Sequence, residues 1–431
     1  MRQYRWRVAA GLAALLLAGA CHNSGHNQNS TDMRSLNAVV DAEPLDFVVA
    51  DDVKASALPL GSASSYSEFT AGARDVKIRS STVQSVLAQK TLQFGDGLNS
   101  TVIAYGTRAA TQILQIGDDT ISPSSGHFKV RVLPFAANAA GIDFYATSGD
   151  ISTVAPTISG IGYSSPTDYT EVTPGTYRII FTNTGTKDII FQSSARAFAE
   201  GTKLSVAVLP ASGGTLVNAM LLTPPGDDSA TFIANSSARV KVVNAVPDSP
   251  NLVFKAGGTV LFSSVPFTGG SSYALVPAGA QTLQVEAANV PGSALASLSR
   301  TLDPAKDYTV LALNRLSQAQ LVALLDDNTL PGSTLARVRF ANALVGSSSV
   351  DVLVNFASQA SGIPYGGTSG YYQIAQGTVA ANTAYTVTFA TPGGATAIVT
   401  LSPVEIFGGN VYTFYLFGTT GAPQAKLIRD R

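Results

Sequence analysis

The chain has a single cysteine, Cys21, so no disulfide can form within it. Only 13% of its 431 residues are charged, about half the usual share. The formal net charge is −1, so the basic surplus that would neutralise phosphates is missing and nucleic acid is not an expected partner. A surface so poor in charge takes its polarity from Ser, Thr, Asn, Gln and Gly, which favours a β-rich protein.

The groups that usually carry catalysis are also scarce. Beyond the N-terminal segment the only histidine is His127, so neither a Ser-His-Asp triad nor a zinc cluster can be built around it. The sequence has no Gly-rich phosphate loop and no H-E-x-x-H motif. We therefore expect the protein not to be an enzyme. A hydrolase that uses paired carboxylates is the less favoured alternative, because its acids would have to converge in a cleft.

The N-terminus has the layout of an export signal. Arg2, Arg5 and Arg7 precede an apolar run over residues 8–17, and small residues lead to Cys21. The run is too short to cross a bilayer core of about 30 Å as a helix. This pattern predicts a signal peptide over residues 1–20.

Residues 17–21, Leu-Ala-Gly-Ala-Cys, resemble the lipobox of bacterial lipoproteins, although Ala18 stands where Leu is usual. The resemblance implies cleavage before Cys21 and acylation of that cysteine; the alternative is an ordinary secretory leader that leaves a free thiol. We expect a lipidated Cys21 with a polar tether over residues 21–33, and a protein anchored to a membrane of the cell envelope. His22 is not the Asp that usually retains lipoproteins at the inner membrane, so the outer membrane is favoured in a cell with two membranes.

One pattern recurs four times in the rest of the chain. It consists of an apolar pair, a polar turn, a tyrosine, an apolar residue three positions later and a glycine six positions after the tyrosine. The tyrosines are Tyr66, Tyr169, Tyr273 and Tyr371, which stand 103, 104 and 98 residues apart. Four matches at nearly one period predict a tandem repeat of about 100 residues.

Each repeat reads as a series of short strands. Opening stretches such as residues 239–242, Arg-Val-Lys-Val, alternate polar and apolar side chains, which predicts one buried and one solvated face. About seven strands in about 100 residues, with frequent turns, are typical of a sandwich. We therefore predict an all-β fold of tandem immunoglobulin-like (Greek-key) β-sandwich domains. The predicted units span residues 34–126 and 127–235, both divergent, then 236–334 and 335–431.

The repeated tyrosine has two interpretations. It could form a binding platform, or it could be a core residue whose hydroxyl fixes a loop, and the second interpretation is favoured. The repeated glycine is expected to supply a turn with positive φ.

The third repeat opens on residues 238–250, ARVKVVNAVPDSP. This resembles the bacterial family called domain of unknown function 4397, whose members typically open on A-R-V-R, two apolar residues, His or Asn, and A-x-P-D-x-P. The fourth repeat matches in part over residues 336–343, the second has Pro134 at the His/Asn place, and the first keeps only Asn37 and Ala38. The resemblance implies tandem copies in an exported protein, often a lipoprotein, and implies no activity.

Aspartate pairs recur before the predicted junctions. They are Asp118 and Asp119, Asp227 and Asp228, and Asp326 and Asp327. Each pair stands 11–12 residues before the opening valine of the next unit. Carboxylates are ligands that Ca²⁺ prefers, so the pairs are candidate calcium sites; the alternative is that they are solvated turn residues. No other cofactor or metal is expected.

Together these features predict a membrane-anchored lipoprotein of the cell envelope with a non-enzymatic structural, adhesive or interaction role. The alternative is a surface module that binds glycan or peptidoglycan, which would expose aromatic side chains in one concave patch. The expected partners are the membrane, through the lipid on Cys21, and an envelope protein or a glycan.

Overall fold

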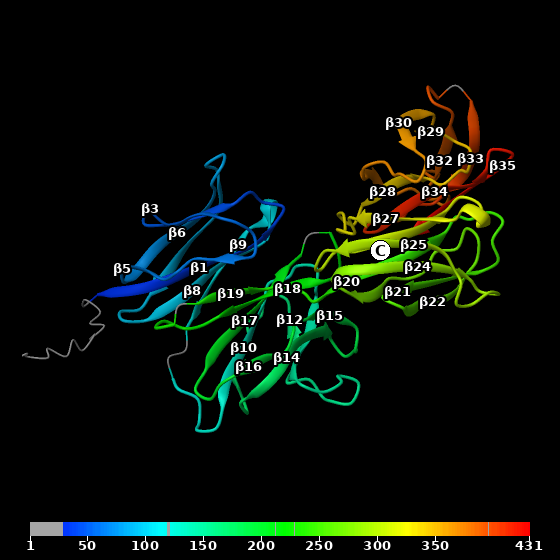
Figure 1. The fold of residues 1–431 in the computed structure, drawn as a ribbon. Helices are drawn as coiled ribbons and strands as arrows, with labels where there is room; N and C mark the ends of the chain where they lie inside the picture. Colours follow the sequence, from blue (N-terminus) through cyan, green and yellow to red (C-terminus); the bar gives the residue numbers. More distant parts are fainter. Residues whose placement is uncertain (1–28, 119–120, 212, 228, 395) are drawn as a thin grey trace, which may run out of the picture.

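A computed structural model describes residues 29–118, 121–211, 213–227, 229–394 and 396–431. In these residues the chain forms four β-sandwich units, numbered here in chain order (Figure 1). They contain no α-helix and only two 3₁₀ turns, η1 (Arg108–Ala110) and η2 (Leu316–Gln318). The predicted all-β fold of tandem β-sandwiches is confirmed.

The strands divide among the units as follows. Unit 1 contains β1 (Ser30–Val40), β2 (Leu45–Val49), β3 (Asp52–Leu58), β4 (Ser62–Ala63), β5 (Ser67–Thr70), β6 (Gly72–Ser80), β7 (Val86–Phe94), β8 (Asn99–Thr107) and β9 (Gln112–Gly117). Unit 2 contains β10 (Phe128–Pro134), β11 (Gly141–Thr147), β12 (Ile158–Gly162), β13 (Thr170–Val172), β14 (Gly175–Asn183), β15 (Ile189–Gln192), β16 (Arg196–Phe198), β17 (Lys203–Pro210), β18 (Val217–Leu222) and β19 (Ala230–Ile233). Unit 3 contains β20 (Ser237–Asn244), β21 (Leu252–Ala256), β22 (Thr259–Val265), β23 (Ala274–Pro277), β24 (Gly279–Ala287), β25 (Ala294–Leu302), β26 (Asp307–Leu313) and β27 (Gln320–Asp326). Unit 4 contains β28 (Leu335–Asn342), β29 (Ser349–Val354), β30 (Ala357–Pro364), β31 (Tyr372–Ala375), β32 (Tyr385–Ala390), β33 (Ala397–Val404), β34 (Val411–Thr419) and β35 (Ala422–Arg429).

All four units share one core strand order, to which unit 2 adds β19 beside β18. In unit 3 one sheet runs β23-β20-β26-β27 and the other β22-β21-β24-β25, and the corresponding strands of unit 4 are ordered identically. We call the sheet that contains the opening strand the inner sheet. Its opening strand pairs in parallel with a late strand of the same unit: β1 with β8, β10 with β17, β20 with β26, and β28 with β34. This order differs from that of immunoglobulin constant domains, in which the first, second, fifth and fourth strands share one sheet.

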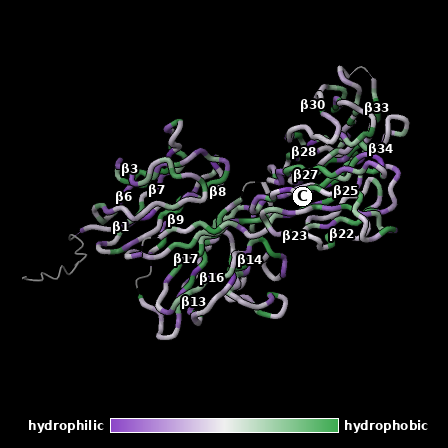
Figure 2. The backbone as a smooth tube through the Cα atoms, viewed as in Figure 1, coloured by the Kyte–Doolittle hydropathy of each residue, from purple (hydrophilic) through white to green (hydrophobic). Residues whose placement is uncertain are grey.

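Each unit has its own apolar core between its two sheets. In unit 3, Val240 and Val242 from β20 meet Phe254 and Val285 from the other sheet. These positions alternate along the strands, as the period-2 pattern predicts. Figure 2 shows the resulting hydrophobic stretches along the strands of all four units.

The first unit begins earlier than the sequence indicates. Strand β1 starts at Ser30, pairs with β5 from Ser30 to Met33, and buries the Met33 side chain. The expected tether over residues 21–33 therefore ends before Ser30, because four of its residues belong to the sheet. The signal peptide, Cys21 and the earlier part of the tether lie outside the described residues.

The units associate two by two. Unit 1 packs against unit 2 and unit 3 against unit 4, in both cases through apolar clusters drawn from the two inner sheets. Smaller contacts join the two pairs: the backbone N–H of Asn328 donates to the Gly213 carbonyl at 2.9 Å, and Arg431 Nη1 donates to the Gly214 carbonyl at 3.1 Å. Figure 1 shows the C-terminus over the strands of unit 3.

Candidate functional site

The inner sheets are buried on both faces. In β34, Phe414 and Leu416 point into the core of unit 4, whereas Tyr415 and Phe417 belong to the cluster shared with unit 3. The buried members of that cluster are Val243, Ala245, Leu311, Leu313, Ala341, Ala343, Tyr415 and Phe417. Burial on both faces explains why β34 is apolar at nearly every position and does not alternate. The unbroken apolar run of β34 was therefore the sequence feature that could have indicated that the units pack against one another.

A cation lies at the same place in each opening strand, opposite a hydroxyl on the strand that pairs with it in parallel. The parallel register pairs are Arg34 with Thr101, Arg131 with Ser205, Lys241 with Thr309, and Arg339 with Thr413. The alternation predicted these cations to be solvated, and that prediction is wrong. They are 1%, 7%, 1% and 1% exposed, respectively, because the face that carries them lies against the neighbouring unit.

The unit 3–4 interface contains two reciprocal ion pairs. Arg339 of unit 4 pairs with Asp326 of unit 3, and Lys241 of unit 3 pairs with Asp430 of unit 4. All four side chains are at most 1% exposed. Each unit thus supplies one cation to its partner and receives one, which is the pattern of a self-complementary interface.

The buried charges of this interface are bound by further polar groups. Arg339 Nε donates to Thr413 Oγ1 at 2.9 Å, and its Nη1 donates to the Leu325 carbonyl at 3.3 Å. Asp326 Oδ2 accepts from Tyr273 Oη at 2.6 Å and from Thr309 Oγ1 at 2.7 Å. A buried ion pair needs such additional hydrogen bonds to offset its desolvation.

The unit 1–2 interface repeats half of this arrangement. Arg131 of unit 2 donates from Nη2 to Asp118 Oδ1 of unit 1 at 2.8 Å, from Nη1 to the Gly117 carbonyl at 2.8 Å, and from Nε to Ser205 Oγ at 2.7 Å. Arg34 instead donates to the backbone carbonyl of Thr223 at 2.8 Å. Within the described ranges no second ion pair joins the two units, and unit 2 has Pro224 two residues after the end of β18, where the other units have an aspartate.

The repeated tyrosines belong to these interfaces. Tyr66 donates its hydroxyl to Asp118 Oδ2 at 2.6 Å, as Tyr273 does to Asp326. The guanidinium groups of Arg34 and Arg131 lie over the Tyr66 and Tyr169 rings, each 4.7 Å from the ring centroid. The tyrosines thus hold the carboxylates and cations in place, which extends the favoured structural interpretation to the contacts between units.

The surroundings shift the pKa values of several of these groups. Burial acts to raise the pKa of Asp326, but Arg339 and Lys241 outweigh burial and hold that pKa below its ordinary value. Burial, reinforced by the Asp326 charge, raises the pKa of Tyr273 well above its ordinary value. Asp326 therefore stays ionised and Tyr273 stays protonated at neutral pH, as their hydrogen bond requires.

The two members of an aspartate pair do not share one environment. Asp118 and Asp326 are buried and have arginine partners, so the interpretation as solvated turn residues does not describe them. Asp327 is 43% exposed at its side chain and pairs with Arg337 at 2.6 Å. Asp227 is exposed, while Asp119 and Asp228 lie outside the described residues. In the part of the chain that the structure describes, no cluster of three or more potential metal-ligating side chains occurs.

The repeated glycine takes the predicted positive φ in two of the four units. Gly72 and Gly279 take positive φ values of 112° and 99°, whereas Gly175 and Gly377 do not.

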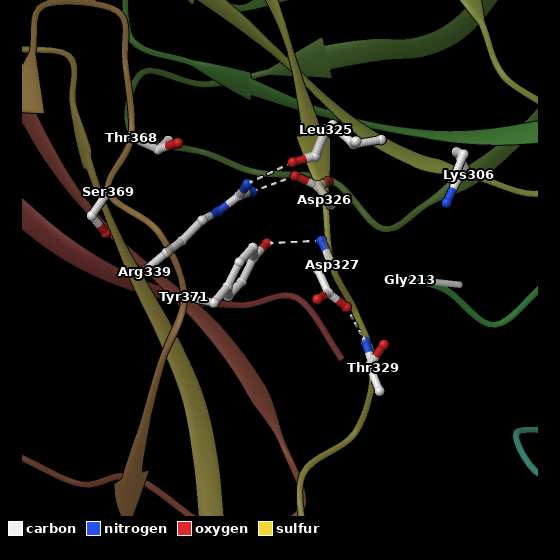
Figure 3. A pocket seen from close by; sticks show the side chains of 10 residues that line it. All are labelled: Gly213, Lys306, Leu325, Asp326, Asp327, Thr329, Arg339, Thr368, Ser369 and Tyr371. Atoms are coloured by element: carbon white, nitrogen blue, oxygen red, sulfur yellow. Dashed lines mark hydrogen bonds and ion pairs between the residues drawn. The ribbon is translucent and has the colours of Figure 1, made fainter. Parts of the chain in front are cut away.

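A cavity of about 400 Å³ adjoins the unit 3–4 interface. It is lined by Gly213, Lys306, Leu325, Asp326, Asp327, Thr329, Arg339, Thr368, Ser369 and Tyr371. Figure 3 shows Arg339 directed at Leu325 and Asp326, and the Tyr371 hydroxyl facing the backbone of Asp327. These polar groups point at one another, so the cavity walls are part of the interface network.

Strongly exposed aromatic side chains are few in the described part of the chain. In the described ranges the strongly exposed ones are Phe232 in unit 2 and Phe356 and Phe407 in unit 4. Nor does any helix in those ranges have the length and apolar character needed to cross a membrane.

Two solved structures show distant likeness. The Bacillus anthracis TIE protein aligns over 90% of this chain and 68% of its own, with 11% identity and a TM-score of 0.15. A family CBM26 module, CBMbc from Eubacterium rectale Amy13K in complex with maltoheptaose, aligns over 46% of this chain and 99% of its own, with 11% identity and a TM-score of 0.16. Likeness at this level carries no inference about function. No curated protein sequence matches the chain.

One sequence-family model matches three stretches of the chain, residues 31–145, 238–345 and 336–431. These stretches cover units 1, 3 and 4 and the first two strands of unit 2. Unit 2 keeps the shared strand order although its later strands fall outside the match. Because the matches extend over well more than half of its length, the chain belongs to the family described as Domain of unknown function (DUF4397).

Proposed function

We propose that this protein is a cell-envelope lipoprotein that is held to a membrane by lipid on Cys21 and whose four sandwiches form a stiff, non-enzymatic array. In this role the array acts as a spacer or scaffold that carries an interaction surface away from the membrane. The observation that carries the proposal is the pairing of buried charges between neighbouring units, which is reciprocal between units 3 and 4 and single between units 1 and 2.

The position of the repeated polar residues supports this proposal. A catalytic or ligand-binding role would leave such residues open to solvent or directed into a cleft. Here Asp118, Asp326 and their cation partners are buried and bonded to one another. Groups arranged in this way fix the angle between neighbouring units, because a unit that rotated away would leave a charge buried without its partner.

The anchor is tested by Cys21→Ser. We expect the wild-type protein to incorporate labelled palmitate and to fractionate with membranes, and we expect the substituted protein to lose the label and either become soluble or accumulate as precursor. Because Cys21 is the only cysteine, no other thiol can take up the label. A Cys21→Ser protein that still fractionates with membranes like the wild type would contradict the proposal. In a cell with two membranes we expect the outer-membrane fraction.

The alternative of a glycan- or peptidoglycan-binding module predicts retention on a glycan or peptidoglycan matrix. A binding surface built from Phe356 or Phe407 would lose that retention on substitution by alanine. The array proposal predicts that these substitutions leave both anchoring and stiffness unchanged, so the two roles are distinguishable.

A further inference from the structure

Unit 3 differs from the other units at the interface cation. Units 1, 2 and 4 have an arginine there, whereas unit 3 has Lys241. An ammonium has three hydrogen-bond donors. The structure gives Lys241 Nζ one acceptor, Asp430 Oδ1, and places it 5.4 Å from the centroid of the Tyr273 ring. Arg339 at the equivalent place reaches four different groups.

The Lys241–Asp430 pair is sealed from water. The two side chains are 1% and 0% exposed, and Nζ and Oδ1 are in direct contact. Thr413 Oγ1 donates to the other carboxylate oxygen, Asp430 Oδ2, at 2.6 Å. Tyr415 is fully buried beside the pair, and its hydroxyl has no hydrogen-bond partner. An amine and a carboxyl group are therefore held together in a dry site.

We propose that Lys241 and Asp430 condense into an isopeptide bond that joins unit 3 to unit 4. The bond forms between Lys241 Nζ and Asp430 Cγ, and one Cγ–O bond of the carboxyl group breaks. The ammonium gives up two protons, which leave with that oxygen as one water molecule. The product is a neutral amide, so the step needs no oxidant, reductant or other co-reactant.

Three features of the site favour this step. Direct contact makes the reaction intramolecular, and well-oriented groups react as if at effective concentrations of roughly 10⁵–10⁸ M. Condensation also removes two charges from an environment that solvates them poorly. Finally, the Thr413 hydroxyl donates a hydrogen bond to Asp430, which polarises the carboxyl group toward attack by the amine.

The same interface contains an unreactive counterpart. Arg339 and Asp326 occupy the equivalent positions with the units exchanged, but a guanidinium stays protonated in proteins and is not a nucleophile. The cross-link would therefore be confined to one of the two pairs. It would connect β20 to the residue that follows β35, across 189 residues of sequence, and would keep the two units joined even when both are unfolded.

The test is mass spectrometry of the purified Cys21→Ser chain. Tryptic cleavage of a cross-linked chain yields a branched peptide in which residues 240–255, uncleaved at Lys241, carry the dipeptide 430–431, and its mass is one water molecule less than the sum of the two. Lys241→Arg is the matched control, because it restores the residue of the other units and cannot form the amide. Its chain should show linear peptides only, and its intact mass should lack the loss of water.

Asp430→Asn provides a second check, since condensation with an amide side chain releases ammonia and yields the same branched peptide as the wild type. On a denaturing gel the cross-linked wild type should migrate faster than Lys241→Arg, because its unfolded chain contains a closed loop. A wild-type chain that yields only linear peptides, cleaved at Lys241, would overturn the proposal and leave an ion pair. That result would not affect the proposed array, which rests on the buried pairs themselves.

Discussion

The substitution Asp326→Asn tests the role of the buried ion pairs. Asn is isosteric with Asp, so the change removes the charge and leaves Arg339 buried at 1% exposure without its ion-pair partner. Breaking a buried pair in this way costs about 3–5 kcal/mol. Because the amide oxygen of Asn can still accept one hydrogen bond, we expect the lower end, about 3 kcal/mol.

The neighbouring residue provides a matched control. Asp327→Asn makes the same chemical change one position away, where the side chain is 43% exposed and the Arg337 pair lies at the rim. Exposed pairs contribute about 0–1 kcal/mol. The two variants share composition and net charge, and they differ only in whether the lost charge was buried.

The assay is hydrogen exchange in the whole exported chain, followed by mass spectrometry on peptides from β20, β26, β28 and β34. A loss of about 3 kcal/mol should speed exchange there roughly 100-fold, whereas Asp327→Asn should change it by less than about fivefold. Replacing both partners with apolar residues, Asp326→Leu with Arg339→Met, should recover most of the loss, because no charge is then left unpaired. Equal effects of Asp326→Asn and Asp327→Asn would refute the reasoning.

Three further predictions follow from the same contacts. The pKa of Asp326 is below its ordinary value in the folded chain, so the stabilisation from the Asp326 carboxylate is complete above pH 3.8 and is lost as the pH falls below that value. Melting curves at neutral pH and near pH 3 should therefore differ more for the wild type than for Asp326→Asn. Residues 236–334 alone would expose Val243 and Leu311 and leave Lys241 without its partner, so this fragment should melt below, and self-associate more than, residues 236–431; equal melting temperatures would contradict the pairing. Because Asp326 already has a cation partner, melting curves in EDTA and in millimolar calcium should coincide, whereas a rise of several degrees in calcium would establish a metal site.

Much of the fold follows from local pattern in the sequence. The spacing of the repeated tyrosines predicted the number of units. The alternation along β20 predicted that Val240 and Val242 face the core, because side chains on a strand point to the same face at every second residue. The boundary at Ser30 was missed because Ser30–Met33 becomes a strand only through pairing with β5 and β8, which lie later in the chain.

The interfaces were harder to predict for a different physical reason. Alternation says that the face carrying Lys241 differs from the face carrying Val240, but it does not say what covers that face. A polar residue on a strand is usually solvated. Lys241 can be buried only because the partner unit places Asp430 opposite it, which offsets the cost of removing the charge from water. The same holds for Asp326, whose partner lies 13 residues further along, in the next unit.

The central claim is that paired units are held at one fixed angle by their buried charges. It is tested most directly by double electron–electron resonance between spin labels on units 3 and 4. Replacing Cys21 by Ser removes the only native thiol, and Ser297→Cys on β25 with Ser361→Cys on β30 places labels at exposed positions of the two sheets away from the interface. We predict one narrow distance distribution, which broadens when Asp326→Asn is added. A broad distribution that Asp326→Asn leaves unchanged would contradict a stiff array.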